Sequence, residues 1–346
     1  MTAAEKLSEL PAGTRRQGYE IRAVLGGGQR SLVYKAYDVM LDRYVALKEY
    51  LPVAFAARDE NRQLVVLPGK DEAFSEGLKR FIAEAQVMTQ LNHFALRGSY
   101  QVFMDAGSAY IVMPYYPGKS LRAMVQDDWR AANIGDVLMI VLPLLEGLSL
   151  LHRMRYCHCG VSPDNILIRD NGEPILLDFG AAQRPGAFPD RPVTDLAPGF
   201  AALEQYRDNG HDVCIGAWTD IYGISAVIYY IVTGILPPEA MARVAHDPLK
   251  PLASFARDDL PAFLLEIIDQ GLSVAPQNRF ASIDDFATAL DYTVQKALVS
   301  SPTSATPAMS EILSVATAVS AYSPRTRKIL QSTWALREQI RQRGVV

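Results

Sequence analysis

Three consecutive glycines, Gly26, Gly27 and Gly28, lie in a stretch whose backbone could bind phosphate. Residues 19–38 alternate apolar and polar side chains on either side of these glycines, which predicts two strands joined by a turn. Because glycine lets the backbone approach a ligand closely, such a turn can offer its N–H groups to phosphate oxygens. Glycine runs are also common in turns that are merely flexible, so this stretch alone decides little.

A lysine and a glutamate further along could contribute charge to the same chemistry. The run YVALKEYLP predicts a strand carrying Lys48, and RFIAEAQVMTQLNH predicts a helix carrying Glu84. A lysine in a strand is more often a solvated edge residue. Glu84, in contrast, lies beside an apolar face of the helix, where a covered charge needs a partner. That face consists of residues spaced by three and four, namely Phe81, Ala85, Met88 and Leu91.

The stretch from Tyr156 to Asn165 reads YCHCGVSPDN, and Asp178-Phe179-Gly180 begins thirteen residues after Asn165. Together the two motifs resemble the catalytic loop and the metal-binding motif of bacterial, eukaryotic-type Ser/Thr protein kinases. His158, Pro163 and Asn165 stand where that family has them. The resemblance implies that Asn165 and Asp178 bind Mg²⁺.

The side chains that perform phosphotransfer in this family are replaced. Gly160 stands at the position of the aspartate that accepts the proton of the substrate hydroxyl, and Ser162 at the position of the lysine that steadies the phosphoryl group. Ala197 replaces the threonine that links these two, and Cys159 replaces the arginine that pairs with a phosphorylated activation loop. The resemblance therefore predicts a retained fold without catalytic residues.

The nucleotide-binding positions, in contrast, are retained. The resemblance assigns Lys48 to the ATP phosphates with Glu84 as its ion-pair partner, although Ser31 departs from the third glycine of the family's loop. The predicted nucleotide-binding residues are Leu25, Gly26, Gly28, Val33, Ala46, Lys48, Glu84, Met113, Pro114 and Tyr116. The residues implied to support the fold are His158, Phe179, Glu204, Asp220 and Arg279. The adenine would use the carbonyl of Pro114 and the N–H of Tyr116.

The predicted fold class is α+β, with a small, mainly β lobe that carries one helix and a larger, mainly α lobe. Residues 99–116 predict two strands with a turn at 105–107, and the Asp-Asn-Gly at 170–172 predicts a hairpin turn. The predicted divisions are an arm at 1–18, the small lobe and hinge at 19–116, the large lobe at 117–296, a Ser/Ala/Pro-rich linker at 297–322, and a basic amphipathic helix at 323–346. The resemblance extends from about Tyr19 to Val294.

Composition limits the class of partner. A net charge of −4 gives no general attraction to nucleic acid, and three cysteines are too few for a disulfide framework. Metal ligation by Cys157-His158-Cys159 is disfavoured because three adjacent residues cannot all face one ion. The N-terminus lacks a secretory h-region and no run is apolar enough to span a membrane, so a cytoplasmic location is expected.

Three functions remain open. The leading hypothesis is a pseudokinase that binds ATP and Mg²⁺ and regulates a protein partner, such as an active kinase or its substrate. The second is a slow kinase, or an enzyme that adenylylates a partner, because positioning and electrostatics account for most of phosphoryl transfer. The third is a scaffold with an empty cleft, which the retained nucleotide residues disfavour. Membrane contact is expected only through the C-terminal helix, which carries six Lys or Arg against one Glu.

Overall fold

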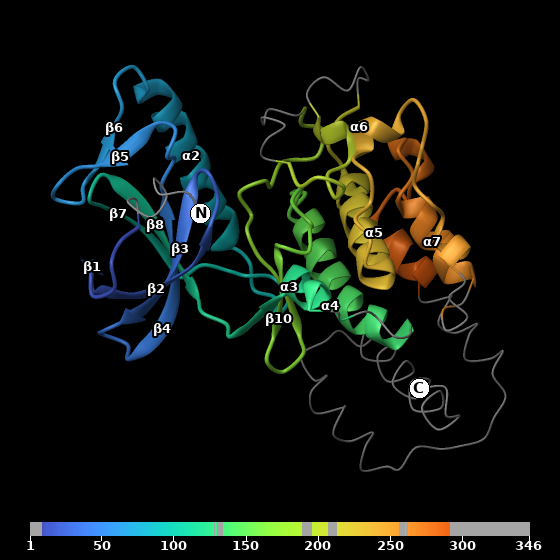
Figure 1. Cartoon of the computed structure of the whole chain (residues 1–346), viewed down its shortest axis with the longest axis horizontal. Helices are drawn as coiled ribbons and strands as arrows, with labels where there is room; N and C mark the ends of the chain where they lie inside the picture. Colours follow the sequence, from blue (N-terminus) through green and yellow to red (C-terminus); the bar gives the residue numbers. More distant parts are fainter. Residues whose placement is uncertain are drawn as a thin grey trace, which may run out of the picture. The chain divides into compact units, whose positions relative to one another are not determined.

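The computed structural model describes residues 9–127, 129, 134–188, 196–206, 213–255, 260 and 262–290. The chain forms two compact units (Figure 1), of which the first comprises Met1–His93 with Arg97–Pro117 and the second Phe94–Leu96 with Gly118–Val346. Strands dominate the first unit and helices the second. This distribution confirms the predicted α+β class.

The first unit is built on a six-stranded antiparallel sheet in the order β1-β2-β3-β4-β8-β7. Its strands are β1 Arg15–Arg16, β2 Tyr19–Gly27, β3 Ser31–Asp38, β4 Arg43–Tyr50, β7 Gln101–Asp105 and β8 Ser108–Pro114. The predicted turn between β7 and β8 is present, and both of its central residues, Ala106 and Gly107, have positive φ angles. A two-residue turn of this kind matches the twist of the strands that it joins.

A second hairpin, β5 Ala56–Arg58 paired with β6 Leu64–Val66, was not predicted. Its strands are only three residues long, too short for an alternating pattern to stand out. The hairpin lies close to the turn between β7 and β8, because Leu64 donates its backbone N–H to the carbonyl of Ala106. A Cβ added to Gly107 would come within 2.2 Å of the Leu64 carbonyl oxygen, so this contact requires glycine.

Helix α2 spans Asp71–Met88, so the prediction of a helix over residues 80–93 was wrong at both ends. The acidic residues Asp71 and Glu72 stabilise the start because they face the positive end of the helix dipole. At the other end the hydrogen bonds tighten to a spacing of three residues, with Leu91 donating to Met88, which closes the helix. Leu91 is buried as predicted, although it lies after the end of the helix.

The arm predicted over residues 1–18 is not simply a polar extension. Residues 1–8 lie outside the described part of the chain. Of the remainder, Arg15–Arg16 forms β1, and Leu10 is buried in the core on one face of the sheet. The expected turn before Tyr19 is present, with Thr14 donating to the carbonyl of Pro11. A single leucine in a polar run carries no periodic signal, so its place in the core could not be predicted.

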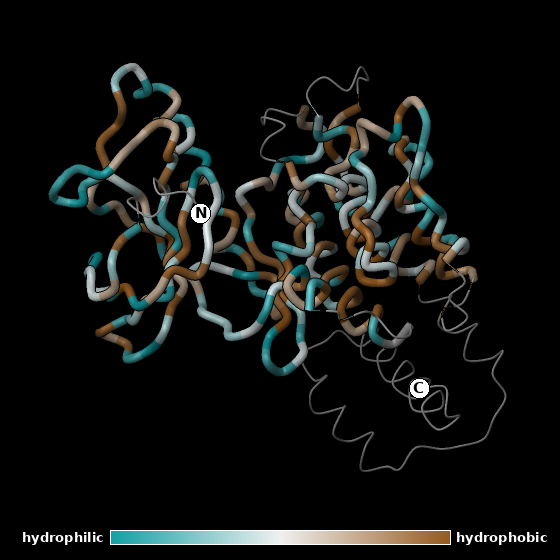
Figure 2. Tube along the Cα trace, viewed as in Figure 1, coloured by the Kyte–Doolittle hydropathy of each residue, from teal (hydrophilic) through white to brown (hydrophobic). Residues whose placement is uncertain are grey.

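The second unit is mainly helical. Its helices are α3 Leu121–Gln126, α4 Ile134–Arg153, α5 Ala217–Thr233, α6 Ala240–Arg243 and α7 Ala262–Gly271, with 3₁₀ turns at Leu203–Gln205, Leu252–Phe255 and Pro276–Asn278. A small sheet in the order β11-β10-β9 joins Pro174–Leu176, Ile166–Arg169 and Gly118–Ser120. Helix α5 is buried along almost its whole length, and brown, hydrophobic segments alternate with paler ones along its trace (Figure 2). It forms the centre against which α4 and α7 pack.

The hairpin predicted around residues 170–172 joins β10 to β11, with Gly172 at a φ of 85°. The linker predicted at 297–322 and the helix predicted at 323–346 lie outside the described residues. Within the described ranges, no helix has both the length and the apolar character needed to cross a membrane.

Candidate functional site

In the first unit, the ion pair implied for Lys48 and Glu84 is formed. The Lys48 ammonium on β4 lies 2.7 Å from a carboxylate oxygen of Glu84 on α2. The two side chains are only 8 % and 4 % exposed, so neither charge is simply solvated. Because a buried charge needs a partner, this pair fixes α2 relative to the sheet and holds the ammonium group in place.

The glycine turn between β2 and β3 depends on Gly27, which was not among the predicted nucleotide-binding residues. A Cβ on Gly27 would lie 2.8 Å from the carbonyl oxygen of Ser31, whereas Gly26 and Gly28 have open space around them. Gly28 donates its N–H to the same carbonyl and closes the turn. Leu25 precedes the turn and is 46 % exposed. Glycine is therefore required by the turn itself at Gly27, while the open space at Gly26 and Gly28 would allow a ligand to approach the backbone.

The residues predicted to contact adenine lie on β3, β4 and the end of β8. Val33 pairs directly with Lys48, and Ala46 pairs with Met113. Residues paired in this way share a face of the sheet, so Val33, Ala46, Lys48 and Met113 lie on one face. Tyr116 follows β8 in the connecting segment.

Arg97 is a residue near the hinge that the sequence reasoning missed. Its guanidinium donates to the carbonyl of Pro114 at 3.1 Å and lies 5.9 Å from the centre of the Tyr116 ring. A carbonyl oxygen has two lone pairs, so Pro114 retains capacity for one further donor. Arg97 is buried and lies far from Pro114 in the sequence, and it belongs to no motif that would have indicated this contact.

In the second unit, Asp220 on α5 holds the loop that contains His158. Its two carboxylate oxygens accept the backbone N–H groups of His158 and Cys159, each at 2.8 Å, and the imidazole of His152 at 2.7 Å. Burial alone would raise the pKa of the Asp220 carboxyl, but the hydrogen bond and charge of His152 outweigh it and hold the pKa below its ordinary value. The anchoring role implied for Asp220 thus has the expected contacts.

A second clamp on this loop comes from Gln205. Its side-chain amide donates to the carbonyl of Cys159 at 2.7 Å and accepts the N–H of Ala202 at 2.9 Å. Cys159 has a φ of 56°, which is uncommon for a residue other than glycine. Such a conformation costs about 1–3 kcal/mol and persists only where its surroundings hold it. Asp220 and Gln205 supply that hold.

His158 and Phe179 pack edge to face, with ring centres 4.8 Å apart. Burial lowers the pKa of the His158 imidazole, so the ring is neutral near pH 7. The neutral ring accepts the N–H of Gly160 at Nδ1 and lies 3.2 Å from the carbonyl of Leu177 through Nε2. This imidazole connects the loop to the segment that carries Asp178.

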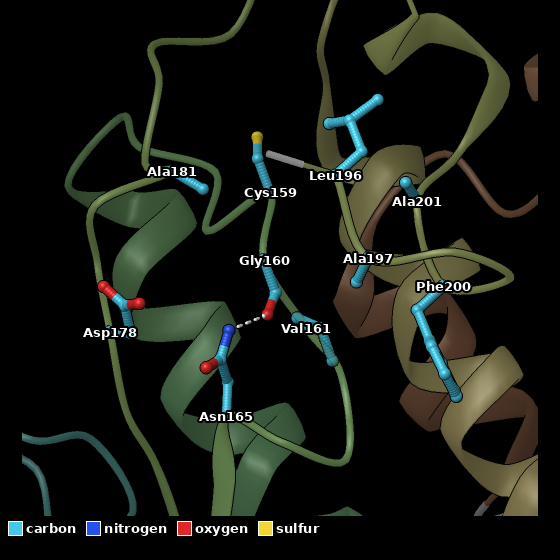
Figure 3. Close-up of a pocket in the computed structure, with 10 residues that line it drawn as sticks. All are labelled: Cys159, Gly160, Val161, Asn165, Asp178, Ala181, Leu196, Ala197, Phe200 and Ala201. Atoms are coloured by element: carbon cyan, nitrogen blue, oxygen red, sulfur yellow. Dashed lines mark hydrogen bonds between the residues drawn. The ribbon is translucent and has the colours of Figure 1, made fainter. Parts of the chain in front are cut away.

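Asn165 and Asp178 face one another across the same pocket (Figure 3). The amide nitrogen of Asn165 donates to the carbonyl of Gly160 at 2.8 Å, which leaves its oxygen on the side of the Asp178 carboxylate. Asp178 has a φ of 57°, a second uncommon conformation at this site. A carboxylate and an amide oxygen are the ligand types that Mg²⁺ prefers, so these residues fit that ion.

The pocket itself is bordered at Gly160 and Ala197 by small residues that carry no reactive group. It encloses about 490 Å³ of empty space, including its open mouth. Its walls are formed by Cys159, Gly160, Val161, Asn165, Asp178, Ala181, Leu196, Ala197, Phe200 and Ala201. Gly160 does not have a positive φ, and a Cβ there would meet its nearest neighbour, Ala181, at 3.3 Å. The backbone therefore does not demand glycine, and the missing side chain is not explained by geometry.

Two other polar side chains near the pocket cannot replace the missing ones. Ser162 is 1 % exposed. Asp164, the remaining carboxylate of the loop, accepts both its hydrogen bonds from the Nε of Arg122, at 2.7 and 2.8 Å. Arg122 in turn packs over the rings of Phe200 and Tyr230. Asp164 is thus paired with an arginine and is not a wall residue of the pocket.

The pair Glu204 and Arg279 is fully buried, with both side chains 0 % exposed and their charged atoms 2.8 Å apart. Arg279 also donates to backbone carbonyls, including those of Ser273 and Val274. Thr219 donates its hydroxyl to the same Glu204 oxygen. This pair joins the 3₁₀ turn at Leu203–Gln205 to the start of α5 and to the segment after α7.

A cluster of His152, Cys157 and Asp220 brings potential metal ligands within 4.8 Å of one another. The carboxylate oxygens of Asp220 already accept three hydrogen bonds, and burial raises the pKa of the Cys157 thiol, which keeps it protonated. These contacts explain the cluster as part of the loop anchor.

The lysine–glutamate pair in the first unit and the Asn/Asp pair in the second are each features of the protein kinase class, and comparisons with known proteins agree. The Protein kinase domain family matches residues 19–287. Serine/threonine-protein kinase PknL of Mycobacterium bovis is 31 % identical over 272 residues, covering 76 % of this chain and 62 % of the relative. Serine/threonine-protein kinase PksC of Streptomyces coelicolor is 27 % identical over 284 residues, covering 77 % of this chain and 47 % of the relative.

A solved structure described as the apo form of PpkA-294 is 30 % identical, with a TM-score of 0.72. The match covers 82 % of this chain and 99 % of that one. The chain therefore belongs to the protein kinase domain family. It spans only about three fifths of the length of PknL, at 62 %.

Proposed function

We propose that this chain is an ATP-binding pseudokinase that regulates or scaffolds bacterial Ser/Thr kinase signalling, with little or no phosphotransfer. The observation that carries the proposal is the contrast between the retained nucleotide-binding groups and the lost catalytic ones. The groups suited to Mg²⁺ and phosphate keep their contacts, whereas the positions that would accept and relay the proton are Gly160, Ser162 and Ala197.

For nucleotide binding, Lys48 would pair with the phosphates while Glu84 holds its ammonium group. Asn165 and Asp178 would hold Mg²⁺, which neutralises phosphate charge when it is bound. The carbonyl of Pro114 would bind the base. Each of these proposed roles falls to a residue in the described part of the chain.

For phosphotransfer, no wall residue of the pocket supplies a proton acceptor beyond Asp178, which the metal would engage. A general base contributes about 10²–10⁴-fold to rate. Cys159 in the loop and Asp178 beyond it both have uncommon backbone angles, which persist only where the surroundings hold them. A site held in this way is suited to binding a ligand.

The alternative is a slow kinase or an adenylylating enzyme. It is favoured by the same intact framework, since positioning and electrostatics dominate phosphoryl transfer. It is opposed by the bond between Asp164 and Arg122, which engages the one other carboxylate of the loop. We therefore place it second.

Thermal unfolding with ATP, with and without Mg²⁺, tests the binding proposal. ATP at 100 times its Kd should stabilise the protein by about 2.7 kcal/mol, and Mg²⁺ should increase the shift in Tm. Asp178→Ala should abolish the Mg²⁺-dependent part. The matched control is Asp164→Ala, which removes a carboxylate from the same region without touching a proposed ligand, and should keep the Mg²⁺ effect. The proposal fails if millimolar ATP produces no shift, or if Asp178→Ala responds to Mg²⁺ as the wild type does.

The partner is proposed to be a protein, either an active kinase or its substrate, in the cytoplasm. The segment 323–346 lies outside the described residues; its sequence has six basic residues, and the helix predicted from it would have an apolar side formed by Ile329, Leu330, Trp334, Leu336 and Ile340. Arg337 interrupts that apolar side, which favours docking on protein over insertion into a membrane. Trp fluorescence with and without anionic vesicles separates these cases, because only membrane binding gives a vesicle-dependent blue shift.

A further inference from the structure

Glu49, the residue after Lys48 on β4, is fully buried. Its carboxylate has no role in the proposed nucleotide binding. Its carboxylate accepts hydrogen bonds from the hydroxyls of Tyr34, at 3.0 Å, and Tyr110, at 2.5 Å. Arg58, on the β5–β6 hairpin, donates to the same carboxylate. A carboxylate buried this deeply is stable only while such donors remain.

The two tyrosine hydroxyls that donate to Glu49 also accept from the N-terminal segment. Tyr34 accepts the backbone N–H of Leu10, and Tyr110 accepts the Nε of Arg16, both at 3.2 Å. Leu10 is packed in the core on this face of the sheet. Residues 9–16, here called the strap, are thus joined to Glu49 through two buried hydroxyl groups.

The strap also holds the β5–β6 hairpin that supplies Arg58. Arg16 donates to the carbonyl of Arg62, and Arg62 donates back to the hydroxyl of Thr14, each at 3.2 Å. Arg58 donates to the same Arg62 carbonyl. The third donor to Glu49 therefore depends on the strap as well, because the hairpin turn and the strap fix one another.

The neighbours of Glu49 in β4 point the other way, toward α2. Lys48 pairs with Glu84, and Tyr50 donates to the carbonyl of Phe74 at 3.0 Å. Tyr50 is held closely, since a Cβ on Gly77 would come within 2.2 Å of its hydroxyl. Because side chains alternate across a strand, anchoring Glu49 on one face fixes the backbone from which Lys48 projects on the other.

We infer that the strap, acting through the positioning residue Glu49, sets the place of the Lys48 ammonium and thereby the affinity of this chain for nucleotide phosphates. Release of the strap would take one donor from each of the Tyr34 and Tyr110 hydroxyls and free the hairpin that places Arg58 against the Glu49 carboxylate. The hydrogen bonds to Glu49 would then rearrange, and β4 would shift with them. Docking of the strap is then a means of regulating the site. This inference rests on the proposed binding of ATP.

The test measures the Kd of Mg-ATP and of adenosine by competition with a fluorescent ATP analogue, at a temperature where every variant is folded. Tyr34→Phe removes only the hydroxyl that joins Leu10 to Glu49. We expect the Kd of ATP to rise about tenfold, equivalent to about 1.4 kcal/mol, while the Kd of adenosine stays unchanged. Tyr222→Phe is the matched control, because it removes a buried hydroxyl that accepts from Arg243 in the second unit, and should change neither Kd.

A purely structural strap would lower Tm in Tyr34→Phe without changing the Kd of ATP, or would weaken ATP and adenosine equally, and either result overturns the inference. If Tyr34→Phe does not fold, Arg16→Met repeats the test, since it removes the contacts to Tyr110 and Arg62 and leaves the core intact. A wild type that binds no ATP would instead refute the proposed function, so the two failures are distinguishable.

Discussion

Wild-type protein should transfer no more phosphate from labelled ATP than Lys48→Ala does, whereas the triple variant Gly160→Asp, Ser162→Lys, Ala197→Thr should gain activity. The aspartate at position 160 alone should lower the activation free energy of transfer by about 3–5 kcal/mol, which corresponds to the 10²–10⁴-fold effect of a general base. The backbone permits this change, because a Cβ at Gly160 meets Ala181 at 3.3 Å and needs only a small adjustment.

Residues that act as one catalytic unit are strongly non-additive, so each single replacement should recover much less than the triple variant. Ser162 is almost fully buried, and a lysine placed there must reach the pocket to avoid an unpaired charge. The triple variant carrying Lys48→Ala is the control for contaminating kinase. Ordinary turnover by the wild type, lost in Lys48→Ala, would contradict the pseudokinase proposal. A single variant as active as the triple would instead contradict the expectation that the three residues act as one catalytic unit.

Arg279→Met should destabilise the protein by about 3–5 kcal/mol, because it leaves the buried carboxylate of Glu204 without its charged partner. The variant also loses donors to the carbonyls of Ser273 and Val274. Urea unfolding followed by circular dichroism measures the change. Adding Glu204→Gln to Arg279→Met should recover part of the loss, since the uncompensated charge is then removed.

The matched control is Arg80→Met, which breaks the exposed ion pair between Arg80 and Glu76 on α2. Exposed pairs of this spacing contribute only about 0.3–0.5 kcal/mol. Equal losses in Arg279→Met and Arg80→Met would show that the buried pair does not stabilise the fold in the way described.

Much of the fold and of the candidate site could be predicted from the sequence, because the informative residues fall in motifs that follow one another in a fixed order. The family resemblance named both partners of the Lys48–Glu84 and Glu204–Arg279 pairs, and the structure places each pair within hydrogen-bonding distance. Turns with strong local chemistry, such as that at Gly172, were also predicted correctly. Whether the nucleotide residues bind ATP stays a prediction.

The residues that the sequence did not reveal act through contacts between distant segments. Gln205 clamps Cys159, Arg97 reaches the carbonyl of Pro114, and Leu10 enters the core of the sheet. None belongs to a periodic pattern or a motif, and each depends on which segments the fold brings together. Glu49 is a further case, since alternation along β4 predicts a buried side chain there but not the partners that make a buried carboxylate tolerable.

The fate of bound ATP separates a pseudokinase from an active enzyme. Protein is incubated with Mg²⁺ and ATP labelled at the γ-phosphate, or in parallel at the α-phosphate, and the retained nucleotide and the labelled protein are quantified in the same sample. We predict that intact ATP is recovered from the wild type and much less from Lys48→Ala, with no label on the protein from either phosphate. Absence of retained ATP, γ-label transfer at the roughly 1–100 s⁻¹ of ordinary kinases, or α-label transfer to protein would each contradict the account.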